Sequence, residues 1–367
     1  MNFKKYVSML LAVMMLLAVL AGCGAQNDSQ TSDDGNTPAE ITNSVENPTD
    51  DTDVDAPDSD QLPDVSAKYE PVTIENFDRT VEFTEKPKRV VVLTLNSAEM
   101  IAALGEADAI TAVAHNNNIV EDVLPEYYEI LKNCDFPEVI NSGIPTLEGM
   151  LSLDPDVVVC NSYYFNAPQI FGSMEDYQVN GVEFYITEGS YLADCTIENT
   201  YNDIRNLGAI FGKQAEAENV ISNMQQRVTD VTEKVSGKEP LKVMSLDNID
   251  EDSYYVAGGI GLAQDLITLA GGINVFEDSD KQFSVVNVEE IISRNPDVIV
   301  IHAYTYAGLE EAQAKIDVLM NTEELSEVPA VKNNNIIVVP VFQVNPSIQN
   351  INYVEDLAAA MYPELFN

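Results

Sequence analysis

The sequence predicts an α/β protein whose folded part has two related halves with mostly parallel sheets, joined by one long helix. Three observations support this. Short apolar runs alternate with helical patterns, one motif occurs twice at a constant offset of 141 residues, and a long helical pattern separates the two copies. The 367 residues are enough for about two or three average domains, and 45% of them are hydrophobic, so sizeable cores can be buried.

The chain begins with the pattern of a secretory signal. Two lysines precede an apolar run over 7–21, which is shorter than the roughly twenty residues that a membrane-spanning helix needs. The run ends in Leu-Ala-Gly-Cys23, which resembles the bacterial lipobox, whose Cys becomes the lipidated first residue. We expect a signal peptide over 1–22 and lipidation at Cys23. The alternative is an ordinary signal peptide with an incidental Cys.

Residues 23–67 predict a disordered, acidic tether behind the lipidated Cys. From 24 to 67 the chain has no Lys or Arg, twelve Asp or Glu, and few large apolar side chains, so it cannot bury enough surface to fold. The part from Lys68 onward has 49 acidic and 16 basic residues, a charge of −33. This charge excludes a nucleic-acid binder and disfavours tight docking on anionic lipid.

The first half, the N-terminal lobe over 68–196, alternates strands with helical spacing. The valine runs are typical of buried parallel strands, and Gly105 ends the first helix. The expected elements are a strand at 89–93, a helix at 97–104, and strands at 109–114, 157–159 and 182–186.

A helical connection is predicted over 197–239. One helix covers 197–211, and a second one covers 213–236, with Gly212 between them and Gly237 at its end. The second helix has an apolar stripe at steps of three and four and is roughly 36 Å long at 1.5 Å per residue. It is long enough to pass from one lobe to the other, and a helical connection should restrict hinge motion.

The pattern restarts in the C-terminal lobe, over 240–367. Residues 147–159 align with 288–300, and each copy is a short helix, a Pro-Asp break and a buried strand, which indicates duplicated lobes. The expected elements are a strand at 241–246, a helix at 261–270, strands at 298–301 and 336–339, and a closing helix at 353–361.

Several motifs in this order resemble the substrate-binding lipoproteins of ABC importers, in the iron-siderophore, haem and cobalamin class (the Fe/B12 periplasmic-binding domain). They are Glu85-Lys-Pro-Lys-Arg-Val-Val-Val-Leu, Pro145-Thr-Leu-Glu, Gly271-Gly-Ile-Asn-Val-Phe, the two repeat copies and the long connecting helix. The resemblance covers about 70–365. It implies two Rossmann-like lobes with a ligand cleft between them.

The resemblance also implies a function. The chain would be the extracellular component that captures an iron chelate, haem or corrinoid and delivers it to a membrane permease. It would be no enzyme, have no cofactor of its own, and form a monomeric body. The lipid anchor would hold it on the extracytoplasmic face of the cell membrane of a one-membrane bacterium.

Members of this family dock on basic residues of the permease dimer through one acidic residue in each lobe. The positions that match in the two repeat copies are Glu148 and Glu289. Both lie near expected helix starts, where a carboxylate is favoured. The alternative is that each residue only caps its helix.

Ligand contacts are expected in loops that follow the carboxyl ends of the strands. These loops are rich in aromatic and amide side chains, which suit a large, flat and partly polar ligand. The candidates are Asn96, His115, Tyr163, Tyr164, Tyr191, Tyr254, Phe283, His302, Tyr304 and Phe342.

The cleft loops contain almost no basic residues, Lys281 being the main exception. An anionic catecholate chelate is therefore disfavoured against a neutral or cationic siderophore, a corrinoid or haem. His115 and His302, one in each lobe, are candidates for axial contacts to the metal of a bound chelate, with Tyr304 or Tyr306 as anionic alternatives. The alternative for each His is an ordinary hydrogen-bonding role.

The remaining cysteines give no redox or zinc motif, because no C-x-x-C pair occurs. Two His are also too few for a metal cage built on imidazole. Cys160 follows three valines and is expected in a buried strand. A disulfide between Cys134 and Cys195 and free thiols are both compatible with the sequence.

Two other classes of function compete with the binding protein. A chelatase or lyase could use two α/β lobes and the carboxylate-rich stretch 247–252, but no nucleophile elbow, P-loop or G-x-G-x-x-G motif is present. A surface adhesin would explain the tether, but not the duplicated lobes or the paired glutamates.

Overall fold

The structure is a computed structural model that describes residues 69–114, 118–141 and 143–366. By its internal contacts the chain forms one compact unit from Val65 onward. The signal peptide predicted over 1–22 and the tether predicted over 23–67, with Cys23, lie outside the described residues.

The first sheet is parallel, with four strands in the order β4-β3-β5-β6. Along its central strand β3, Val90 and Val92 belong to one hydrophobic cluster and Val91 to another. Both faces of the sheet are therefore covered, as the valine runs predicted. The strands are β3 (Val90–Val92), β4 (Ile110–Val113), β5 (Val157–Cys160) and β6 (Glu183–Ile186).

Short helices surround this sheet, and several begin at a capping side chain. Thr94 caps α2 by accepting a hydrogen bond from the Ser97 amide, and Ser173 caps α7 through the Asp176 amide. The buried Phe171 of α6 packs against Tyr177 of α7 and Phe184 of β6. The helices are α2 (Leu95–Ala103), α3 (Pro125–Leu131), α4 (Glu138–Asn141), α5 (Leu147–Ser152), α6 (Pro168–Phe171) and α7 (Met174–Gln178).

An antiparallel hairpin that the sequence analysis did not predict precedes the first sheet. It consists of β1 (Val72–Asn76) and β2 (Arg79–Phe83), which form a sheet of their own. The buried Asn76 side chain donates to the Ile186 carbonyl oxygen and accepts from the Ile186 amide, both at 2.8 Å. The hairpin is therefore attached to the outer edge of β6 by two side-chain hydrogen bonds, which replace those that the backbone of a neighbouring strand would make.

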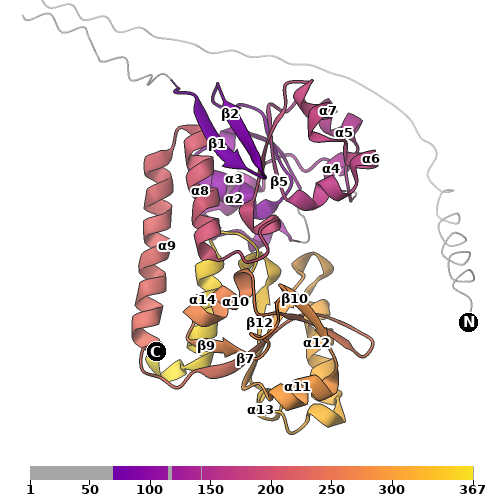
Figure 1. The fold of residues 1–367 in the computed structure, drawn as a ribbon, viewed down its shortest axis with the longest axis vertical. Helices are drawn as coiled ribbons and strands as arrows, with labels where there is room; N and C mark the ends of the chain where they lie inside the picture. Colours follow the sequence, from indigo (N-terminus) through magenta and orange to yellow (C-terminus); the bar gives the residue numbers. More distant parts are fainter. Residues whose placement is uncertain (1–68, 115–117, 142, 367) are drawn as a thin grey trace, which may run out of the picture. The chain divides into compact units, whose positions relative to one another are not determined.

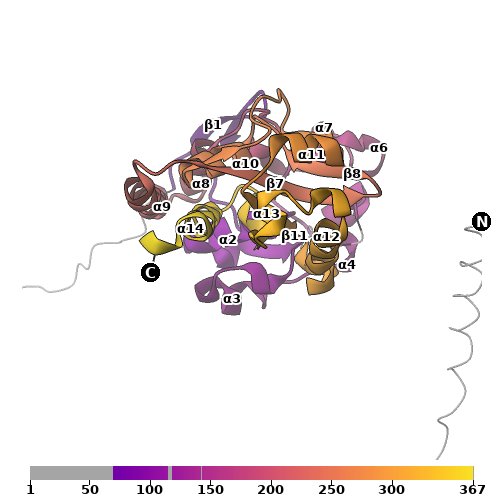
Figure 2. The same ribbon diagram turned by 90° about the horizontal axis from the view of Figure 1, so that it is seen from below.

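Two long helices, α8 (Ile197–Phe211) and α9 (Gln214–Val235), lie between the sheets in the sequence. Gly212 separates them in the left-handed conformation, at φ 67°. The 22 residues of α9 span roughly 33 Å. Helix α9 packs first against α8 and then against α14 (Asn350–Met361), as Figures 1 and 2 show. The predicted long helix thus passes along both lobes.

The second sheet has six strands and is mixed. β7, β11 and β12 lie where strands were predicted, and β7 pairs in parallel with β11, and β11 with β12. The other edge of β7 pairs in parallel with β9 and then antiparallel with β8, which β10 extends. β8, β9 and β10 were not predicted. The strands are β7 (Leu241–Asp250), β8 (Ser253–Ala257), β9 (Gly272–Asn274), β10 (Phe283–Val286), β11 (Val298–Ala303) and β12 (Ile336–Pro340).

One hydrophobic cluster connects the two lobes. It contains Val90 of the first sheet, Ile221 of α9, Val243 of the second sheet and Leu357 of α14, and smaller clusters cover the outer faces of the sheets. The lobes therefore share part of their core. The second-lobe helices besides α14 are α10 (Leu262–Leu269), α11 (Val288–Arg294), α12 (Leu309–Asn321) and α13 (Pro329–Lys332).

The sequence repeat is also a structural repeat. Thr146 caps α5 and Asn287 caps α11, each by accepting a hydrogen bond from the amide three residues later. In each copy a residue with positive φ follows the helix and directly precedes the Pro-Asp pair. This residue is Asp154, at φ 49°, in the first copy and Asn295, at φ 53°, in the second. The two copies therefore place Glu148 and Glu289 at equivalent positions in the first turns of α5 and α11.

Two further properties concern the described part of the chain. None of its helices is both long and apolar enough to span a bilayer. Cys134, Cys160 and Cys195 are free thiols, so the structure does not contain the disulfide considered between Cys134 and Cys195. Cys160 is fully buried in β5, as expected.

Candidate functional site: a cavity between the two lobes

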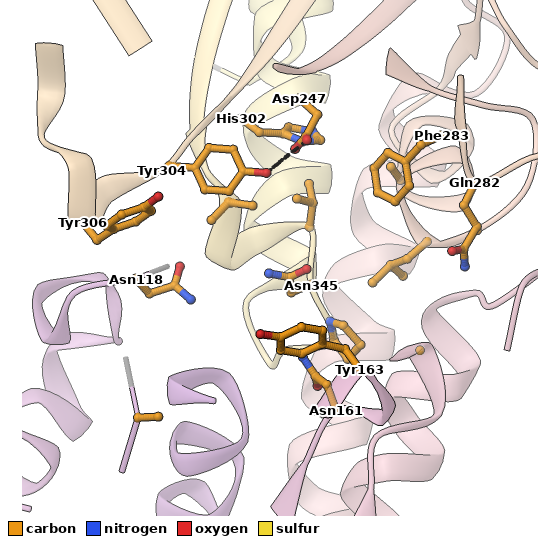
Figure 3. Close-up of a pocket in the computed structure, with 18 of the residues that line it drawn as sticks. Asn118, Asn161, Tyr163, Asp247, Gln282, Phe283, His302, Tyr304, Tyr306 and Asn345 are labelled. Carbon is orange, nitrogen blue, oxygen red and sulfur yellow. Dashed lines mark hydrogen bonds and ion pairs between the residues drawn. The ribbon is translucent and has the colours of Figure 1, made fainter. Parts of the chain in front are cut away.

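A cavity of about 960 Å³ opens between the lobes and is lined by residues of both. This volume lies in the range of small-molecule binding sites. In Figure 3, Asp247, His302 and Tyr304 face Tyr163 and Asn161 of the first lobe across the cavity. Asn161 and Tyr163 follow the carboxyl end of β5, and His302 and Tyr304 lie at the carboxyl end of β11, which is where ligands bind in α/β folds.

A chain of hydrogen bonds fixes Asp247 in the second-lobe wall. The pairing of β7 with β11 brings Asp247 beside His302, whose Nδ1 lies 3.3 Å from Asp247 Oδ1. The Tyr304 hydroxyl donates to both carboxylate oxygens, at 2.9 and 3.0 Å. His302 Nε2 lies 2.8 Å from the hydroxyl of buried Ser245. Because a carboxylate only accepts, the Nδ1 proton points to Asp247.

The buried Lys315 lies behind this wall and does not line the cavity. Its ammonium group donates to the carbonyl oxygens of Asp247 and His302 and pairs with the Glu311 carboxylate at 2.5 Å. Burial alone would raise the pKa of the Asp247 carboxyl, but the hydrogen bonds from His302 and Tyr304 and the charge of Lys315 lower it below its ordinary value. Asp247 therefore stays ionised.

A loop that carries Gln282 and Phe283 forms another part of the lining. Two glycines permit its position, because a Cβ on Gly258 or Gly259 would overlap carbonyl oxygens of segment 277–281. The Gly258 amide also donates to the Gln282 carbonyl oxygen at 2.8 Å. Phe283 remains 57% exposed, so its ring is available to a ligand.

The first-lobe wall follows β5. Tyr163 is 46% exposed and its ring centroid lies 4.8 Å from that of Tyr164. The Tyr164 ring is almost buried, and its hydroxyl donates to the Leu93 carbonyl oxygen. The Tyr163 ring is thus accessible from the cavity, and the buried Tyr164 ring packs against it.

Segment 341–350 enters the lobe interface and adds Asn345 to the lining. Gln349 donates to the Glu99 carboxylate of α2 at 2.9 Å. Glu99 is fully buried, and burial raises its pKa to about 7 against the hydrogen bonds from Leu124 and Gln349. A buried carboxyl therefore lies in the contact between the lobes.

Five of the ten ligand candidates line the cavity, four do not, and one lies outside the described residues. Tyr163, Tyr164, Phe283, His302 and Tyr304 line it. His115 lies outside the described residues.

The other four candidates have structural roles instead. The Asn96 amide donates to the Phe342 carbonyl oxygen across the lobes, and the Phe342 ring is fully buried. Tyr254 is buried in the second-lobe core, and Tyr191 packs against Phe77. None of the four lines the cavity, so the structure gives them no contact with a ligand there.

The structure leaves no free ring nitrogen on His302 for the predicted axial contact to a metal. Both of its ring nitrogens already interact with protein atoms, and only 1% of the residue is exposed. Tyr304 is also unsuited as an anionic ligand, because burial and the neighbouring Asp247 raise its pKa above the usual value. Within the described ranges, no three His, Cys, Asp or Glu side chains are grouped to hold a metal ion.

The amides Asn161 and Asn345 line the cavity but were not among the predicted ligand contacts. Asn161 directly follows β5, so the rule of carboxyl-terminal strand ends could have found it. Asn345 lies in the connection after β12, from which Phe342 was the predicted contact instead. Asp247 belongs to the stretch 247–252, which was considered for an enzyme, and Gln282 adjoins the candidate Phe283.

Glu148 and Glu289 lie away from the cavity, on exposed surfaces of α5 and α11. Figure 1 shows both helices, one in each lobe, on the side of the molecule opposite α9. Neither carboxylate belongs to an ion pair within the described residues. Two separated negative charges are thus available on one side of the body.

Comparison with known proteins agrees with this architecture. The family described as periplasmic binding protein matches residues 90–341, which is more than half of the chain. A periplasmic binding protein from Veillonella parvula DSM 2008 is similar in structure, with a TM-score of 0.71 and 26% sequence identity, over 81% of this chain and 93% of that one.

Two bacterial relatives are similar in sequence. The uncharacterized ABC transporter substrate-binding lipoprotein YvrC of Bacillus subtilis is 22% identical over 81% of this chain and 87% of its own length. The vitamin B12-binding protein of Vibrio parahaemolyticus is 24% identical over 71% of this chain and 84% of its own length.

These findings confirm the predicted α/β fold and the predicted resemblance. The matched family consists of binding proteins, so the expectation that the chain is not an enzyme is also confirmed. The chain belongs to the periplasmic binding protein family and is a substrate-binding component of an ABC importer.

Proposed function

We propose that the protein captures a metal chelate outside the cell, either a ferric siderophore, haem or a corrinoid, and delivers it to its permease. The cavity of about 960 Å³ carries this proposal. Its exposed aromatic rings, Tyr163, Phe283 and Tyr306, suit a ligand with a large flat or apolar surface. Among its described lining residues there is no Lys or Arg, which disfavours an anionic catecholate chelate.

A calorimetric unfolding panel tests the cargo. We would add cyanocobalamin, haemin, neutral ferrichrome, cationic ferrioxamine B and anionic ferric enterobactin to separate samples. A ligand at 100 times its dissociation constant stabilises the fold by about 2.7 kcal/mol, which raises the midpoint by several degrees. A shift with one member supports the proposal. If only the catecholate shifts the midpoint, the charge argument is wrong, and if no member does, the proposed cargo class is wrong.

We further propose that Glu148 and Glu289 dock the loaded protein on basic residues of the permease. Their equivalent positions in the two lobes and their exposure support this role. Changing both to Gln should leave chelate affinity unchanged and lower uptake into cells. Glu290→Gln, on the next exposed residue of α11, is the matched control. Normal uptake by the double variant would contradict docking through these carboxylates.

The location of the protein is the third part of the proposal. A signal peptide over 1–22, lipidation at Cys23 and a tether over 23–67 would anchor the body on the extracytoplasmic face of the cell membrane. The lobes over 68–196 and 240–367 and the connection over 197–239 would remain outside as a monomer. Cys23→Ala should release the protein from the membrane fraction, and membrane retention of this variant would argue against the lipid anchor.

A further inference from the structure

Asp247 is the only charged side chain among the described residues that line the cavity. It faces the cavity with 22% of its side chain exposed. Its carboxylate accepts hydrogen bonds from His302 and Tyr304 but from no Lys or Arg side chain among the described residues. A carboxylate has about four acceptor positions, so capacity remains for a donor on a ligand.

The charges of Lys315 and Glu311, which lie behind Asp247 in the second lobe, do not cancel the negative charge of Asp247. Lys315 contributes one positive charge, but its ammonium group is paired with the Glu311 carboxylate. Two carboxylates against one ammonium leave one net negative charge at this point. Lys315 is also buried and does not line the cavity, so it cannot bind a ligand in place of the carboxylate.

Aromatic rings surround the carboxylate on the cavity side. The Tyr304 and Tyr306 rings meet edge to face at 6.3 Å between centroids, and Figure 3 shows Phe283 on the other side of Asp247. Aromatic faces attract cations, and they do so more strongly where water is displaced. A fixed carboxylate between aromatic rings is therefore complementary to an organic cation and repels an anion.

We propose that Asp247 is a specificity-determining residue, which binds a cationic nitrogen group on the periphery of the transported chelate. This inference rests on the proposed function, since it assigns a chemical class to the ligand of the same cavity. His302 and Tyr304 act as positioning residues, which hold the carboxylate toward the cavity. The second lobe thus recognises the charge of the ligand, whereas Tyr163 of the first lobe contacts its apolar surface.

A matched pair of ligands tests the inference on the unchanged protein. Ferrioxamine B ends in a free ammonium group, and its N-acetylated form is neutral but keeps the same iron-hydroxamate shell. Titration calorimetry on the full chain should show at least roughly tenfold tighter binding of the ammonium form, because charge-assisted hydrogen bonds are among the strong ones. The Asp247→Asn variant should bind the two forms equally. Asp250→Asn, which removes an exposed carboxylate from the same strand, should retain the preference.

Each other outcome has a distinct meaning. Equal binding of the two forms by the unchanged protein would overturn the inference and leave the proposed function intact, and no variant is needed for this comparison. A preference that survives Asp247→Asn would overturn the assignment to Asp247. Binding of only neutral or anionic members of the wider panel would also overturn the inference alone. Absence of binding by any chelate would overturn the proposed function and the inference together.

Discussion

Replacing Glu99 by Gln is expected to remove a pH-dependent loss of stability. The Glu99 carboxylate is fully buried where α2 meets segment 341–350, and no cationic side chain pairs with it within the described residues. Burial raises its pKa to about 7, whereas the ordinary value is 4.5. The fold therefore favours the protonated form, and the stability that Glu99 contributes is fully present below pH 4.5 and is lost as the pH rises through 7.

The size of this effect follows from the two pKa values. A pKa of about 7 in the fold against 4.5 in the unfolded chain corresponds to about 3 kcal/mol, at roughly 1.4 kcal/mol for each pH unit. Glutamine has the same shape and stays neutral, and its carbonyl oxygen can still accept from the Leu124 amide and from Gln349. The variant should therefore resemble the unchanged protein near pH 4.5 and exceed its stability by about 3 kcal/mol near pH 8.

Urea unfolding followed by circular dichroism, at several pH values between 4.5 and 8, measures this difference. Tryptophan fluorescence is not an option, because the chain has no Trp. Glu148→Gln is the control, because it makes the same change of side chain at an exposed position on α5. A stability difference between Glu99→Gln and the unchanged protein that is the same at every pH would contradict the raised pKa of Glu99.

Three further substitutions have defined outcomes. Asp203→Asn should raise stability above pH 8, because burial raises the pKa of Asp203 to about 8, and lower stability there in urea titrations would contradict this. Asn76→Ala leaves two buried backbone groups unpaired and should cost about 3 kcal/mol in the same titrations, whereas a cost below about 1 kcal/mol would show that water replaces the amide. Gly259→Ala places a Cβ against the carbonyl oxygen of Glu277 and should weaken chelate binding by displacing Phe283, and unchanged affinity in calorimetry would argue against that role.

The sequence predicted the elements whose patterns are periodic and buried. The helix expected over 197–211 matches α8, and the valine runs match β3 and β5, because burial on both sides leaves an uninterrupted apolar run. The repeat was recognisable because each copy needs the same local chemistry. A capping residue starts the helix, and a residue with positive φ ends it.

The site was less predictable, because lining a cavity depends on contacts between distant residues. Asn96 looks like a ligand contact in sequence, but its amide is used by the Phe342 carbonyl oxygen, 246 residues away. His302 looks like a metal ligand, but Ser245 and Asp247 on the neighbouring strand occupy both ring nitrogens. Such partners become visible only when β7 and β11 are paired.

The attachment of Asn76 to β6 has a consequence for solubility. β6 is the edge strand of the first sheet, and an edge strand with free backbone groups can pair with another molecule and start aggregation. Asn76 occupies the amide and the carbonyl oxygen of Ile186, so this part of the edge is closed within one molecule. The edge strand β10 of the second sheet has exposed Phe283 and Val285 but is only four residues long, which limits the pairing that it could offer. Short or occupied edges, together with a net charge of −43, keep neighbouring molecules from joining sheet to sheet.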